Sequence, residues 1–373
     1  MKRKISKVLL IVFILPLIIS GCYNYREINL VTFTTSIIFD IDDVGNVITY
    51  MDCVRPYRNE NESSDSGKRI IYKGKGKTAL EAIRDLNMAA SYKINFSQNR
   101  ALIFTETAAR QGIDKFLSLI NNDQEFQAKP YAFVYFGDVD ELLNITASDE
   151  EYLGVFLNDL VQKNKVNSRT IATNISDYLA ESQIGSDYAL LGALELREDL
   201  GQKRVELKGG VLMKNSIMLE KIDVTEGLSY NFLMNNLSAG TLEIPNPQMK
   251  EGFITLEILN NKTKTDIEYD GSRVLLTKKI KTRVVLAEEQ GRFIYNREAI
   301  KKLEEEEEKR LALYLHSFFD KFNKKNIDIL GIEHTLEKKY PKLIVNNMLS
   351  KIDLKIDVDV NIEGSNRVKN STI

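Results

Sequence analysis

The sequence IDLKIDVDVNIE (residues 352–363) alternates apolar and polar side chains without a break. Successive side chains of a β-strand point to opposite faces of a sheet, so this alternation predicts a strand with one buried face and one solvated face. Further strands are predicted at residues 253–259, 265–269 and 273–287, and Asp270-Gly271 between the last two is typical of a tight hairpin turn. The C-terminal half is therefore expected to be built around an antiparallel sheet.

A long helix is predicted from about Asn296 to Lys325. Its apolar residues fall on one face at helical spacing: Ile300, Leu303, Leu311, Leu315, Phe318 and Phe322. The run Glu304–Glu308 could bind a cation, but a solvated helix face is the favoured interpretation. Glu305 with Lys309, and Glu306 with Arg310, would then form i, i+4 ion pairs. A second helix is expected from Asp328 to Tyr340, where Pro341 would end it.

The first half of the chain alternates strand and helix signals. Strands are predicted at residues 31–40 and 47–54, on either side of a hairpin turn at 42–46, and again at 100–105 and 131–136. Thr78 with Glu81 is a capping-box pattern that begins a helix, and Ser148 with Glu151 begins another. The expected fold class is α+β and multi-domain, with mixed or antiparallel sheets each packed against helices and a long helix in the C-terminal domain.

Composition disfavours several classes of function. The chain has 373 residues and is 43% hydrophobic, which is enough for more than one domain with a buried core. Its formal net charge is −2, and the basic residues are not gathered in one stripe, so nucleic-acid binding is disfavoured. Two histidines and two cysteines leave little material for a metal cluster or a disulfide framework.

Several motifs imitate chemical sites incompletely. Residues 74–78 (GKGKT) look like the end of a phosphate-binding loop, but Ile71 stands where that loop needs a glycine, so a strand-to-helix turn is favoured. The segment 40–45 resembles part of a calcium loop, but Val44 replaces an oxygen ligand and a hairpin is the better interpretation. His316 and His334 lack a third ligand nearby, which favours packing or surface roles. Cys53 lies in an apolar run and is interpreted as a small core residue rather than a nucleophile.

The first 22 residues have the layout of a bacterial lipoprotein signal. Four basic residues precede an apolar run, Val8–Ile19, which is shorter than the roughly 20 residues that span a bilayer. Ser20-Gly21-Cys22 then resembles the lipobox, in which the cysteine thiol receives a diacylglycerol and the preceding peptide bond is cut. Cys22 is therefore the predicted lipid attachment site and mature N-terminus, and two acyl chains suffice for stable anchoring. A conventional secretory signal that merely contains Cys22 is the alternative.

Three regions are expected along the chain. Residues 1–21 form the signal peptide, 22–207 an N-terminal α/β region with room for two subdomains, and 208–373 a C-terminal α+β domain. The second boundary is placed where the polar stretch Leu200–Arg204 is followed by Gly209-Gly210, before a fresh strand at 211–213.

The sequence resembles the Ger(x)C family, the lipoprotein C subunit of the nutrient germinant receptors of endospore-forming bacteria. The resemblance is carried by residues 21–29 (GCYNYREIN), by 74–78 followed by Glu81-Ala82-Ile83, by 326–331 (NIDILG), by Lys339-Tyr340-Pro341 and by the terminal strand. It implies a three-domain α+β protein on the outer face of the inner spore membrane, acting with two integral-membrane subunits of the A and B types. It implies neither catalysis nor a cofactor.

The leading hypothesis is a membrane-tethered, non-enzymatic subunit that serves as scaffold and partner for the integral subunits in spore germination. The alternative is a surface lipoprotein that captures a small solute, which would require a deep cleft with convergent polar groups. A cell-wall hydrolase, which would need a pair of carboxylates in a groove, is the third class considered.

Overall fold

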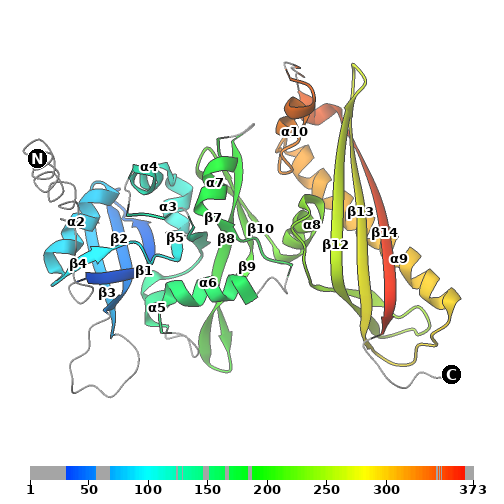
Figure 1. Ribbon diagram of the computed structural model, residues 1–373, viewed down its shortest axis with the longest axis horizontal. Helices are drawn as coiled ribbons and strands as arrows, with labels where there is room; N and C mark the ends of the chain where they lie inside the picture. Colours follow the sequence, from blue (N-terminus) through cyan, green and yellow to red (C-terminus); the bar gives the residue numbers. More distant parts are fainter. Residues whose placement is uncertain are drawn as a thin grey trace, which may run out of the picture.

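A computed structural model describes residues 31–55, 68–122, 125–127, 129–145, 151–163, 168–183, 187–341, 343, 345 and 347–365. The described chain forms two sheets, each packed against helices, and is drawn out along one axis (Figure 1). The α+β class, the mixed sheets and the long helix of the C-terminal domain are confirmed. The predicted lipid site, Cys22, lies outside the described residues.

The N-terminal sheet has ten strands among the described residues. Eight follow the order β10-β9-β8-β6-β5-β1-β2-β3, while β4 pairs with β1 and β7 with β6. The strands β1, β5, β6 and β8 run parallel to one another, which makes the sheet mixed. The bounds are β1 Val31–Ile41, β2 Val47–Arg55, β3 Lys68–Gly76, β4 Lys93–Asn95, β5 Ala101–Thr105, β6 Tyr131–Tyr135, β7 Thr173–Asn174, β8 Tyr188–Asp199, β9 Gln202–Lys214 and β10 Ile217–Ile222.

Helices cover both faces of this sheet. One face packs against α2 (Ala79–Ala89), α3 (Glu106–Gln111), α4 (Asp114–Asn122) and α7 (Ile175–Glu181), and the other packs against α5 (Val139–Asn144) and α6 (Leu153–Lys163). Cys53 is buried in the first of these cores, as predicted, and burial raises the pKa of its thiol to about 12.

The turn from β3 to α2 confirms the structural interpretation of GKGKT. Thr78 caps α2 by accepting a hydrogen bond from the Glu81 N–H. A Cβ atom on Gly74 would lie 2.2 Å from the Ala82 carbonyl oxygen, so glycine lets the strand approach the helix closely. The hairpin at 42–46 is also confirmed, because the Asp42 carboxylate accepts the N–H groups of Val44 and Asn46.

The expected fresh strand at 211–213 is wrong. One strand, β9, runs from Gln202 to Lys214 and pairs with β8 through a hairpin at Leu200-Gly201. Gly209 does not break β9; its φ of +68° and missing Cβ allow contact with the Ile222 carbonyl oxygen. The position proposed for the domain boundary, 207/208, lies inside β9, and β8–β10 belong to the N-terminal sheet.

The C-terminal sheet has the order β11-β12-β13-β14, with β14 parallel to β13 and the other pairs antiparallel. The bounds are α8 Val224–Met234, β11 Thr241–Pro245, β12 Phe253–Tyr269, β13 Val274–Glu289, α9 Arg297–Lys324, α10 Ile332–Lys339, the 3₁₀ turn η3 Met348–Lys351, and β14 Ile352–Ser365. The two strands expected at 253–259 and 265–269 are one strand, because a bulge between Ile258 and Asn260 lets β12 continue through a polar stretch.

The second C-terminal helix begins later than predicted. Asp328 lies before α10 and its carboxylate accepts the N–H groups of Ile332 and Glu333, while Gly331 occupies the left-handed region with φ +61°. The helix therefore begins at Ile332 and not at Asp328.

The interpretation of Glu304–Glu308 as a solvated face is wrong for three of the five residues. Glu304 and Glu308 accept the N–H groups of Ile362 and Val360, at 2.8 and 3.1 Å, on the outer edge of β14. Glu307 shares the buried face of α9 with Leu303 and Leu311 and is only 3% exposed. The i, i+4 ion pairs recorded within the described helix join Lys301 to Glu305 and Lys302 to Glu306, one turn earlier than expected.

Candidate functional site

The two sheets meet at α8, which lies between the last strands of the N-terminal sheet and the C-terminal sheet (Figure 1). A capping box begins this helix: the Asp223 carboxylate accepts the Glu226 N–H, and the Glu226 carboxylate accepts the Asp223 N–H. Phe232 and Leu233 are fully buried in a core that also holds Leu212 and Ile222 of β9 and β10. One continuous apolar core therefore crosses the junction.

Side chains of the C-terminal sheet hold the end of α8. The Thr263 hydroxyl donates to the Phe232 carbonyl oxygen at 2.6 Å, and Lys278 Nζ donates to the Leu233 carbonyl oxygen at 2.9 Å. The last carbonyl groups of a helix have no partner within the helix, and a cation there is favoured by the helix dipole. Lys278 is buried, and burial lowers the pKa of its ammonium group to about 8.

We expect Thr263→Val to reduce the free energy of unfolding by about 1 kcal/mol, because valine keeps the shape but removes the hydrogen bond to α8. Urea denaturation of the variant and of the parent chain measures the difference. Thr277→Val, on the outward face of β13, is the matched control and should change the free energy by less than about 0.5 kcal/mol. Equal losses in the two variants would contradict this role of Thr263.

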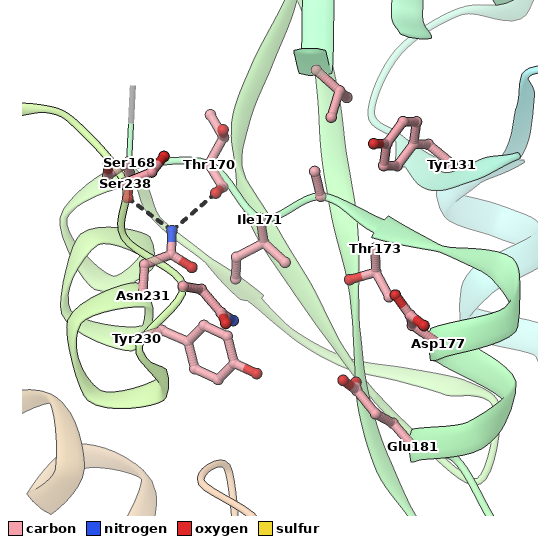
Figure 2. A pocket seen from close by; sticks show the side chains of 13 residues that line it. Tyr131, Ser168, Thr170, Ile171, Thr173, Asp177, Glu181, Tyr230, Asn231 and Ser238 are labelled. Atoms are coloured by element: carbon pink, nitrogen blue, oxygen red, sulfur yellow. Dashed lines mark hydrogen bonds between the residues drawn. The ribbon is translucent and has the colours of Figure 1, made fainter. Parts of the chain in front are cut away.

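The N-terminal domain is held to α8 from the other side. Asn231 Nδ2 donates to the carbonyl oxygens of Ser168 and Thr170, at 2.8 and 3.0 Å (Figure 2). The Arg169 guanidinium pairs with Glu243 on β11 at 2.8 Å. Segment 168–171 is thus tied to both α8 and the C-terminal sheet.

A cavity of about 360 Å³ lies at this junction. Figure 2 shows α7 on one side of it and α8 on the other. Its lining side chains are mostly polar and include neither lysine nor arginine: Tyr131, Val161, Ser168, Thr170, Ile171, Ala172, Thr173, Asp177, Glu181, Tyr230, Asn231, Asn236 and Ser238. Desolvation raises the pKa of the Glu181 carboxyl group, and the charge of Asp177 raises it further. The cavity is therefore rich in hydrogen-bond acceptors.

Glu181 and Tyr230 also line a second cavity, of about 210 Å³, so the two cavities adjoin along the domain junction. The second is more apolar and is bounded by Leu190, Met234, Leu330 and His334 among others. Burial raises the pKa of the Tyr230 hydroxyl. A groove between domains that combines apolar walls with a few polar groups is a common form of ligand site.

The residues singled out from sequence are not gathered at this junction. His334 borders the second cavity, whereas His316 lies half-buried on α9 and Cys53 lies in the N-terminal core. Within the described ranges, no group of three or more His, Cys, Asp or Glu side chains is arranged to hold a metal ion.

Sequence reasoning missed α7 and α8, the helices that carry Asp177, Glu181, Tyr230 and Asn231. The pattern Asp223-x-x-Glu226 would have indicated the start of α8. Asn174, which caps α7 by accepting the Asp177 N–H, would have indicated the start of the other helix. None of the helices among the described residues combines the length and hydropathy needed to cross a bilayer.

Comparisons with known proteins cover both halves of the chain. Residues 24–193 match the family model of the spore germination protein N-terminal domain, and residues 208–366 match that of the spore germination B3/GerAC-like C-terminal domain. The chain is 22% identical to the spore germination protein GerQC of Bacillus cereus over 333 residues, which cover 89% of each protein. It is 20% identical to the spore germination protein B3 of Bacillus subtilis (strain 168) over 366 residues, 94% of this chain and 96% of that one.

A solved structure has the same fold. The crystal structure of the GerBC protein superposes with a TM-score of 0.56 at 16% identity, covering 88% of this chain and 96% of that one.

Proposed function

Because the chain belongs to the Ger(x)C family of spore germination proteins, we propose that it is the membrane-tethered, non-enzymatic C subunit of a nutrient germinant receptor. In this role it is held on the outer face of the inner spore membrane by a lipid on Cys22. Its body serves as a scaffold for two integral-membrane subunits of the A and B types.

One observation carries the proposal: matches to two spore-germination domains follow in order, directly after a sequence that resembles a lipobox. Only residues 23–30 separate Cys22 from Val31, the first residue of β1. An extended chain spans at most ~3.3 to 3.6 Å per residue, so this tether would hold the N-terminal domain within about 30 Å of the membrane surface. A tether also raises the effective concentration of the body near embedded partners.

Spores that carry Cys22→Ala are expected to lose the protein from the inner-membrane fraction and to germinate poorly with nutrients. The substitution removes the acylation site, and with it the two acyl chains that would anchor the protein stably. Germination is followed by the fall in optical density after nutrient addition, and the membrane fraction by immunoblotting.

Cys53→Ala is the matched control, because it removes the other cysteine of the chain from a buried position. It should leave membrane association and germination near the parent values. Normal nutrient germination of Cys22→Ala spores, at equal protein abundance, would contradict the need for the tether.

A further inference from the structure

The acceptor-rich cavity at the domain junction has features of a built binding site. We propose that it binds a small organic cation, an ammonium compound held between α7 of the N-terminal domain and α8 of the C-terminal domain. This inference goes beyond the receptor role and does not depend on the lipid anchor. The volume of about 360 Å³ lies at the low end of the range of small-molecule sites, roughly 300 to 1,000 Å³.

The charges around the cavity favour a cation. Asp177 and Glu181 lie one turn apart on α7, and both line the cavity. No lysine or arginine lines it, and the nearby Arg169 is already paired with Glu243. An ammonium group has three donors and no acceptor, so it complements these carboxylates.

Two buried side chains on α8 present polar atoms to the cavity. Tyr230 and Asn231 are each 6% exposed. Within the described part of the chain, neither the Tyr230 hydroxyl nor the Asn231 carbonyl oxygen has a hydrogen-bond partner, although Asn231 Nδ2 is fixed by two backbone carbonyls. Neither atom is among the fully enclosed polar atoms that lack a partner, so both are open to the cavity and available to an occupant.

The arrangement of these groups suits one compact ligand. Figure 2 shows the Tyr230 hydroxyl directed from α8 into the open space, with Glu181 on the facing α7. The ring of Tyr230 also offers an aromatic face to a cation. Since the walls belong to different domains, an occupant would contact both of them and stabilise the junction.

The test is a titration of the full-length mature protein in detergent with benzylammonium, benzyl alcohol and benzoate, which share one shape but differ in charge. Isothermal titration calorimetry measures binding. We expect only benzylammonium to bind, with a Kd on the order of 1 mM for so small a probe. Equal binding of the alcohol or of benzoate, or no binding of benzylammonium at 20-fold that concentration, would overturn the proposal.

Variants locate the site. Glu181→Gln should weaken benzylammonium binding at least tenfold, and Tyr230→Phe should weaken it severalfold while leaving the fold intact, because its hydroxyl has no protein partner to lose. Glu106→Gln is the matched control: Glu106 lines another acidic cavity, of about 410 Å³, with Asp40, Asp138 and Asp140. An unchanged affinity in Glu181→Gln, or an equal loss in Glu106→Gln, would contradict binding at the junction.

Discussion

Asn231→Leu is expected to reduce the free energy of unfolding by roughly 2 to 4 kcal/mol. Leucine fills a similar volume but leaves the carbonyl oxygens of Ser168 and Thr170 without the amide that they share. An unsatisfied buried carbonyl costs about 1 to 3 kcal/mol, and the substitution removes one buried hydrogen bond, to Ser168, and one partly buried bond, to Thr170. Urea denaturation measures the loss.

Asn236→Leu is the matched control for this prediction. Asn236 borders the same cavity but is exposed, so its substitution should change the free energy of unfolding by less than about 0.5 kcal/mol. If both leucine variants lost the same stability, the two bonds of Asn231 would not be what joins α8 to segment 168–171.

Glu307→Gln is expected to stabilise the protein at pH 8 and to change little at pH 5. Burial raises the pKa of the Glu307 carboxyl group to about 7, and one of its oxygens has no hydrogen-bond partner among the described residues. Between pH 4.5 and 7 the folded chain keeps a proton that the unfolded chain has lost, so stability falls as the pH rises. Above that window, the charged and buried carboxylate lowers the free energy of unfolding by on the order of 3 kcal/mol. Glutamine is neutral and avoids this loss.

The measurement is the urea midpoint of parent and variant at pH 5 and pH 8. Glu305→Gln, on the exposed side of the same helix turn, is the control and should show no such pH-dependent gain. A stabilisation by Glu307→Gln of the same size at both pH values would show that the charge of this carboxylate is not the cause.

Strong periodic patterns allowed much of the fold to be predicted. The alternation at 352–363 became β14, and the apolar spacing after Asn296 became α9, which begins one residue later at Arg297. These patterns are decisive because each element buries one face only. The predicted cap at Thr78 and the hairpin at 42–46 were also correct, since both depend on contacts between near neighbours in the sequence.

The errors came from residues whose environment depends on distant segments. Glu307 belongs to a run of glutamates that was interpreted as solvated, yet its side chain is buried. It lines a cavity together with Leu228 and Phe232 of α8, which only the fold brings close to it. Gly209-Gly210 was interpreted as a domain boundary before a new strand, but Gly209 provides close packing against Ile222 within β9. A short stretch of sequence does not show which residues from distant segments will contact it in the folded protein.

The junction cavity could not be predicted for the same reason. Its polar groups come from segment 168–173, from α7 and from α8, and none of these segments carries a recognisable chemical motif by itself. α8 was also hard to recognise because it is buried around much of its circumference, so it lacks the one-sided pattern of a surface helix.

Purification of the tagged chain from inner spore membranes, in mild detergent, tests the proposed receptor role most directly. The account predicts that two integral-membrane subunits, of the A and B types, are recovered with it in comparable amounts. Recovery of the chain alone, from membranes in which both subunits are present, would contradict its assignment as a receptor subunit.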